Sequence, residues 1–207
     1  MICGVLGEGP SDDVLVPILR WMMQQLCVDE PEVRWIDYRH LGTGRTLASK
    51  VDAALRLQPC DLLFIHRDAD KQPPELRYAE IRAAAAAQPY VGVVPVRMTE
   101  AWLLVDEQAI RQASGRVTGK APLGLPRWGR IEEIADPKAL LQEALLLAHE
   151  GRGRRRRGFD LVQARKRIAD LVEDWSPLRS LPAFQRLERE TGEALGALGV
   201  TVRSPAR

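Results

Sequence analysis

Short runs of consecutive apolar residues alternate, along the first half of the chain, with segments in which apolar residues recur every three or four positions. The runs are bounded by glycine, proline or charged residues, which is typical of short strands. They lie at residues 1–6, 33–38, 62–65 and 90–96. The periodic segments predict helices at residues 13–26, 46–57 and 74–87. Strand and helix are therefore expected to alternate regularly through residue 98.

This alternation predicts an α/β fold with a mostly parallel sheet of about four strands, flanked by helices. The runs at 1–6 and 62–65 are almost entirely apolar, so we expect both strands to be buried on both faces. The segment at 33–38 mixes polar and apolar residues, which indicates a strand nearer the edge. Pro95 cannot donate a hydrogen bond within a sheet, so the last strand is expected to lie at an edge or to end there.

The second half of the chain has a different pattern. Thr99 is a candidate cap for a short helix that contains Trp102, and residues 115–130 are rich in glycine and proline, which predicts an irregular loop. Further helices are expected at residues 136–149, about 160–175 and 182–195. We therefore predict an α/β domain at 1–106 and a loop-rich, helical C-terminal extension at 107–207 that packs on it.

Four acidic residues follow predicted strands at the point where each strand ends. Glu8 follows the first strand, Asp68 and Asp70 follow the third, and Glu100 follows the fourth. All strands of a parallel sheet end at the same edge, where ligands bind, so we expect these carboxylates to gather there. At about 4 Å, two such charges repel by roughly 4 kcal/mol at an effective dielectric of 20. A divalent cation removes this repulsion, and oxygen ligands suit Mg²⁺.

The pattern thus predicts a metal site with Glu8, Asp68, Asp70 and Glu100 as ligands. Glu8, Asp68 and Asp70 are the predicted catalytic residues, and Glu8 either holds a second metal or acts as a general acid or base. The alternatives are a solvated Glu8 in its turn and a Glu100 that caps a helix. We expect three neighbouring residues to contact these ligands and orient them without binding the metal themselves: Asp12, His66 and Arg67. Asp12 is also a candidate helix cap, and His66 is a candidate ligand of Mn²⁺, although a packed or hydrogen-bonded histidine is the more ordinary role.

Charge adds one feature to this picture. The 207 residues include 30 basic and 28 acidic side chains, and five arginines are concentrated at residues 152–157: Arg152, Arg154, Arg155, Arg156 and Arg157. Removing these five leaves 25 basic residues against 28 acidic ones, a balance of −3, so the basic character is local. We predict that this run, together with Lys71, contacts the phosphates of a nucleic acid without reading sequence. The alternative is an ordinary solvated loop.

Composition excludes several other classes of protein. The 45% hydrophobic and 28% charged content is typical of a globular protein. No apolar stretch approaches the roughly 18 residues needed to span a membrane, and the first residues lack the basic and apolar regions of a signal peptide. The three cysteines are odd in number and widely spaced, which indicates reduced thiols. We therefore expect a cytoplasmic protein that does not associate with a membrane.

Four short motifs together carry a resemblance to a known fold. They are G-E-G-P-S-D at 7–12, four apolar residues and H-R-D-A-D at 62–70, E-A-W-L-L-V-D at 100–106 and D-P-K at 136–138. In this order they resemble the TOPRIM fold, a Rossmann-like fold shared by topoisomerases, DnaG-type primases and OLD-family nucleases. Within that fold they are similar to an uncharacterised bacterial family often found beside ATPases in defence loci.

The resemblance implies a function as well as a fold. In TOPRIM proteins the glutamate after the first strand and the D-x-D after the third carry the metal chemistry, and these motif positions match Glu8, Asp68 and Asp70. We therefore expect a nuclease that uses Mg²⁺ or Mn²⁺ on DNA or RNA, with phage defence as its biological setting. Two alternatives remain open: a non-catalytic metal-binding or regulatory partner of an ATPase, and a phosphohydrolase that acts on a small molecule.

Overall fold

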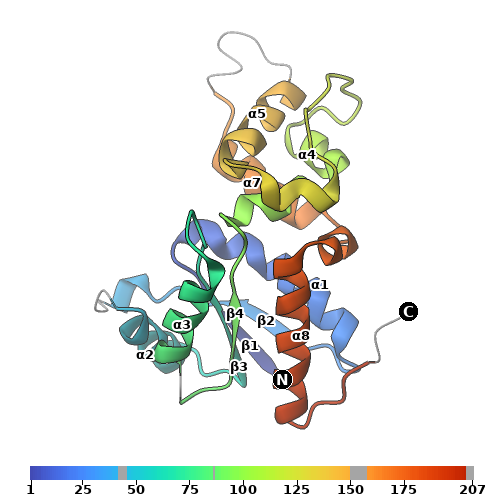
Figure 1. Ribbon diagram of the computed structural model, residues 1–207. Coiled ribbons are helices and arrows are strands. Elements are labelled where there is room, and N and C mark those ends of the chain that lie inside the picture. The colour runs from blue at the N-terminus through green and yellow to red at the C-terminus, as the bar shows by residue number, and fades with distance from the viewer. Residues whose placement is uncertain (42–45, 86, 150–157, 204–207) are drawn as a thin grey trace.

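The computed structural model describes residues 1–41, 46–85, 87–149 and 158–203. Its centre is a sheet of four strands, all parallel, in the order β2-β1-β3-β4 (Figure 1). The strands are β1 (Ile2–Leu6), β2 (Glu32–Trp35), β3 (Leu62–His66) and β4 (Tyr90–Val93). The predicted α/β fold with a parallel sheet of four strands is confirmed, and the two strands expected near the edges, β2 and β4, are the edge strands.

Helices cover both faces of the sheet. On one face lie α2 (Leu47–Leu57) and α3 (Pro74–Ala84), which bury the side chains of Leu63 and Ile65. On the other face lie α1 (Leu15–Leu26) and α8 (Pro182–Ala197), which bury those of Val5 and Phe64 (Figure 1). Because successive residues of a strand point to opposite faces, β3 carries apolar side chains at its first four positions, and all five of its residues are buried, His66 included.

The remaining helices gather beyond the carboxyl edge of the sheet. They are α4 (Glu107–Ala113), α5 (Pro137–His149) and α7 (Leu161–Leu171), and Figure 1 shows them as one group above the strand ends. From there the chain returns along the sheet as α8. One cluster of buried apolar side chains runs from Val5 through Trp102 to α7 and α8. The apolar core is therefore continuous across residue 106, and a domain boundary at that position stays a prediction.

Several predicted elements end at other residues than expected. The segment predicted as one strand to residue 96 leaves the sheet after Val93. The predicted helix at about 160–175 ends at Leu171. Thr99 does not cap an α-helix: Thr99–Leu104 forms a 3₁₀ helix, and Asp106 caps α4 by accepting the N–H of Ala109. Within the described residues no helix is both long and apolar enough to cross a membrane.

Candidate functional site at the carboxyl edge of the sheet

The turn after β1 is built to hold Glu8 at the sheet edge. The Asp12 carboxylate Oδ2 accepts the backbone N–H groups of Glu8 (2.9 Å) and Gly9 (3.0 Å). Asp12 comes from the 3₁₀ helix Pro10–Val14 that precedes α1, and it is largely buried. A Cβ atom on Gly7 would lie 2.5 Å from Cη2 of Trp35 and 2.8 Å from Cβ of Asp12. Only glycine allows this close approach, so Gly7 and Asp12 together fix the position of Glu8.

This packing predicts that replacement by alanine destabilises the protein at Gly7 but not at Gly9. We expect Gly7→Ala to lower the free energy of unfolding by about 1–3 kcal/mol, because the added methyl group would overlap the ring of Trp35 and Cβ of Asp12. Gly9→Ala is the matched control, since its added Cβ would meet only the Ser11 Oγ, at 3.9 Å, and its φ of −150° is open to any residue. Urea denaturation of both variants measures the difference, and equal stability of the two would contradict the close packing at Gly7.

The loop after β3 places Asp68 against a buried histidine. The Nδ1 of His66 lies 3.1 Å from the carbonyl oxygen of Val93, and because a carbonyl only accepts, this nitrogen carries a proton. The other ring nitrogen, Nε2, lies 3.4 Å from Oδ1 of Asp68 and 3.2 Å from the hydroxyl of Thr99. Asp68 Oδ1 also accepts the Thr99 backbone N–H at 2.9 Å. Thr99 therefore links Asp68 to the ring of His66, because its hydroxyl group lies within 3.3 Å of both side chains.

The charges around Asp68 show that the acids of this edge lie close together. Burial raises the pKa of Asp68 from 3.8 to about 6, and the positive charge of a protonated His66 acts in the opposite direction. The negative charges of Asp12, Glu100 and Glu8 raise the pKa further. These three residues follow β1 and β4, the two strands that flank β3. The sheet therefore brings carboxylates from separate loops within electrostatic reach of Asp68.

The raised pKa of Asp68 predicts a pH-dependent destabilisation of the metal-free protein. The folded protein keeps this proton to about pH 6, whereas the unfolded chain releases it near 3.8. Stability from this group is therefore fully present below the unfolded pKa and is lost as the pH rises through the folded value, by an amount on the order of 3 kcal/mol. We expect Asp68→Asn to raise the Tm relative to the unmodified chain more at about pH 7 than at about pH 4. Thermal denaturation with a chelator measures this, and an equal shift at both pH values would contradict it.

Each of the other predicted ligands is paired with an arginine. Glu8 Oε1 lies 2.5 Å from Nε of Arg67, which also contacts Glu80 at 3.2 Å. Asp70 Oδ2 lies 3.4 Å from Nη2 of Arg77. These pairs join the turn after β1, the loop after β3 and helix α3 into one network, and they leave the carboxylates neutralised by cations of the same chain.

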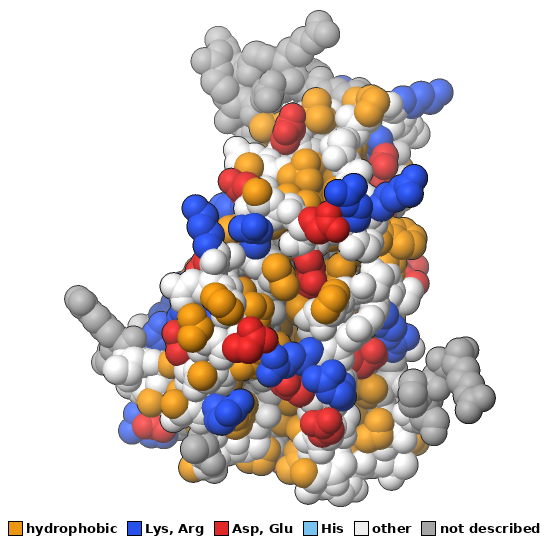
Figure 2. Space-filling view, viewed as in Figure 1, with side chains coloured by type: hydrophobic (Ala, Val, Ile, Leu, Met, Phe, Trp, Pro, Cys, Tyr) orange, Lys and Arg blue, Asp and Glu red, His pale blue; other side chains and the backbone are white. Residues whose placement is uncertain are grey.

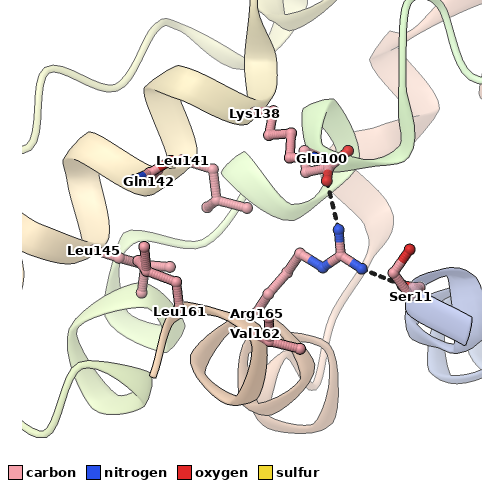
Figure 3. Close-up of a pocket in the computed structure, with 9 residues that line it drawn as sticks. All are labelled: Ser11, Glu100, Lys138, Leu141, Gln142, Leu145, Leu161, Val162 and Arg165. Carbon is pink, nitrogen blue, oxygen red and sulfur yellow. Dashed lines mark hydrogen bonds and ion pairs between the residues drawn. The ribbon is translucent and has the colours of Figure 1, made fainter. Parts of the chain in front are cut away.

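Glu100 is paired with an arginine that lies 65 residues later in the chain. Its carboxylate Oε1 accepts a hydrogen bond from Nη1 of Arg165 on α7 at 2.5 Å, and Nη2 of Arg165 donates to the backbone carbonyl of Ser11 (Figure 3). Both Glu100 and Arg165 are mostly buried, with side-chain exposures of 8% and 15%. They border a cavity of about 210 Å³ that Lys138 and Leu141 of α5 also line. Arg165 therefore ties the C-terminal helices to the acidic edge.

The donor atoms at this edge are of a kind that binds a divalent cation, but their present positions do not converge on one ion. The donors are hard carboxylate oxygens, and no hydrogen bond from the described residues reaches Oδ2 of Asp68. In the described part of the chain, however, no three His, Cys, Asp or Glu side chains are arranged to hold one metal ion. A cation at Asp68 would gain further ligands when Glu8 or Glu100 turned away from its arginine. The donor set is of the kind that Mg²⁺ or Mn²⁺ prefers, and in this structure arginines contact Glu8 and Glu100.

The structure places the remaining predicted residues as follows. Lys71 is exposed beside Asp70, and Arg67 contacts Glu8. The five arginines predicted to bind nucleic acid, Arg152, Arg154, Arg155, Arg156 and Arg157, lie outside the described residues. On the face of the molecule in Figure 2, the basic and acidic side chains that are described are interspersed, with no large area of one sign.

Sequence reasoning named Arg67 and His66, which contact Glu8 and Asp68, but it missed the other partners of the acids. Thr99, Arg77 and Arg165 belong to no recognised motif, and Arg165 follows Glu100 by 65 residues. Thr99 precedes Glu100 directly, and this adjacency was the one signal available for it. Comparison of the chain with protein-family models, curated proteins and solved structures finds no match. The resemblance to TOPRIM proteins therefore stays a prediction that depends on the motifs alone.

Proposed function

We propose that this protein is a metal-dependent phosphodiester hydrolase that acts on nucleic acid, with a TOPRIM-like arrangement of its acidic residues. The observation that carries the proposal is the gathering of acids from separate loops at the carboxyl edge: Nε2 of His66 lies 3.4 Å from Oδ1 of Asp68 and 3.8 Å from Oδ2 of Asp12, the residue that holds the turn carrying Glu8. An arrangement in which like charges repel one another persists most readily where a cation binds. The carboxyl edge of an open parallel sheet is also the usual place for a ligand.

The chain's own residues supply the parts of such a site. Asp68 would hold Mg²⁺ or Mn²⁺ through its open Oδ2, with Asp70, Glu8 and Glu100 as further ligands. A bound divalent ion would stabilise the negative charge that develops on a phosphate during hydrolysis. Asp12 holds the backbone that carries Glu8, and His66 with Thr99 fixes the other oxygen of Asp68. The carboxylates of Glu8 and Asp70 are 39% and 55% exposed, so both face solvent.

The arginine pairs favour a second candidate function. Because Glu8 and Glu100 are both neutralised within the chain, the protein could bind metal only after a change that releases them. A non-catalytic or regulatory subunit that a partner protein opens would have this property, and the similarity to proteins encoded beside ATPases in bacterial defence loci suggests the class of partner. In this case the chain alone is inactive and gains activity or a stable complex only with the ATPase.

A cleavage assay tests the proposal. Supercoiled plasmid DNA and single-stranded RNA are incubated with the purified chain and Mg²⁺, Mn²⁺ or EDTA, and we expect nicking or cleavage with either metal and none with EDTA. Binding through phosphate contacts should weaken steeply with salt, so cleavage is expected to fall between about 50 and 200 mM salt. Turnover of small phosphate esters that does not change with salt would instead indicate the phosphohydrolase, and activity only with an added ATPase would indicate the regulatory subunit.

A further inference from the structure

A second hollow lies beside the acidic edge, between the loops that follow β3 and β4. Its volume is about 250 Å³, and the side chains around it include Asp70, Lys71, Gln72, Arg77, Arg97 and Met98. Three of these side chains are cationic and one is acidic, so the hollow carries a net positive charge. We refer to it as the basic hollow. Two of the residues that line it, Asp70 and Lys71, belong to the same loop as Asp68.

The three cations of the basic hollow are not equivalent. Arg77 is committed to protein groups: its Nε donates to the backbone carbonyl of Asp68 at 3.0 Å, and its guanidinium also contacts Glu80 and Asp70. Lys71 and Arg97 form no ion pair with any described residue. Arg77 therefore holds the loop in place, and Lys71 and Arg97 present charges to the hollow that no carboxylate of the described chain neutralises.

The backbone that carries Arg97 is held in an unusual conformation. The N–H of Asp70 donates to the carbonyl of Arg97 at 2.7 Å, and both residues have positive φ angles, 54° and 65°. Aspartate adopts this region fairly readily, whereas arginine does so at a cost in conformational energy that glycine would avoid. Strained residues of this kind cluster at ligand sites. A role of the Arg97 side chain in binding a ligand in the hollow would explain why arginine occupies this position.

We propose that the basic hollow binds a phosphate group. An unpaired guanidinium and an unpaired ammonium group are the side chains that recognise phosphate most strongly, because their hydrogen bonds to it are charge-assisted. That the phosphate belongs to a nucleic acid strand rests on the proposed function: a strand whose backbone is held at Lys71 and Arg97 would have a neighbouring phosphodiester beside Asp68. The binding of phosphate itself does not depend on catalysis.

The test measures binding without metal, so that a failure of catalysis does not affect it. Fluorescence anisotropy in the presence of EDTA measures the affinity for a labelled single-stranded oligonucleotide of about 12 nucleotides. The proteins compared are the full-length chain and its variants Lys71→Ala and Arg97→Gly. We expect each variant to bind about fivefold more weakly and to lower the slope of log K against log salt by about 0.7. Arg97→Gly also relieves the positive φ, so its Tm should not fall.

Arg56→Ala is the matched control. Arg56 is an exposed cation in the last turn of α2, at the opposite edge of the sheet, and it should change neither the affinity nor the slope. If Lys71→Ala and Arg97→Gly leave the binding of both the oligonucleotide and inorganic phosphate unchanged, or if Arg56→Ala weakens binding equally, the inference is overturned. Inorganic phosphate and a mononucleotide serve as competitors. Binding of these small ligands that both variants weaken, with no effect on the oligonucleotide, would keep the phosphate site and overturn its assignment to a nucleic acid strand.

Discussion

Replacement of Glu8 by Gln or of Asp68 by Asn is expected to lower metal-dependent cleavage at least about a hundredfold. Each change keeps the size of the side chain and removes one negative charge from the edge where a cation would bind. A metal ion contributes several kcal/mol to the stabilisation of a phosphoryl transition state, and each 1.4 kcal/mol corresponds to a factor of about ten in rate. Initial rates of plasmid nicking at saturating Mn²⁺ measure the loss.

The control for these variants is Asp52→Asn. Asp52 is an exposed acid on α2, away from the strand ends, and we expect full activity from this variant. Circular dichroism should show that all three variants stay folded. Asp68→Asn should be at least as stable as the unmodified chain at neutral pH, because it removes a negative charge that burial disfavours. Cleavage that persists undiminished in both Glu8→Gln and Asp68→Asn would show that another part of the chain, or a contaminant, is responsible.

Removal of the Arg165 side chain is expected to have two opposite effects. Arg165→Ala leaves the buried carboxylate of Glu100 without its partner, and breaking a buried ion pair in this way lowers the free energy of unfolding by about 3–5 kcal/mol. The same change frees Glu100 for a cation. We therefore expect Mn²⁺ to raise the Tm of Arg165→Ala by more than it raises that of the unmodified chain, since ligand binding stabilises the folded state by RT ln(1 + [L]/Kd).

Two further variants separate these effects. Arg167→Ala removes an exposed arginine from the same helix and should change neither the stability nor the response to Mn²⁺. In the double variant Arg165→Ala with Glu100→Gln, no buried charge is left unpaired, so much of the lost stability should return and the extra response to Mn²⁺ should disappear. An Arg165→Ala protein that is as stable as the unmodified chain, or whose Tm does not respond to Mn²⁺, would contradict the competition between arginine and metal.

The sheet could be predicted from sequence because its signals are local. The apolar runs at β1 and β3 are short and sharply bounded, and Pro95 marks the end of an edge strand. Topology then places Glu8, Asp68 and Glu100 at one edge without any knowledge of side-chain positions. The part of the candidate site that depends only on the order of the strands was therefore accessible from the sequence.

The partners of these acids depend on packing between distant segments. Arg165 reaches Glu100 because α7 packs against the 3₁₀ helices that follow β1 and β4, and no periodicity in residues 161–171 specifies that contact. Threonine is a residue type that often caps helices. In this structure, however, the N–H of Thr99 donates to Asp68 and its hydroxyl group contacts the ring of His66, and these distant contacts outweigh the capping preference. The left-handed backbone of Arg97 likewise has no sequence signal, because arginine rarely adopts it.

The central claim is that one cation binds among the carboxylates at the edge of the sheet, and anomalous diffraction from crystals soaked in Mn²⁺ tests it most directly. We expect a peak about 2.0–2.3 Å from a carboxylate oxygen of Asp68, with Glu8 or Glu100 turned away from its arginine toward the ion. A map without a peak at this edge, in which the pairs Glu8–Arg67 and Glu100–Arg165 persist at saturating Mn²⁺, would contradict the claim.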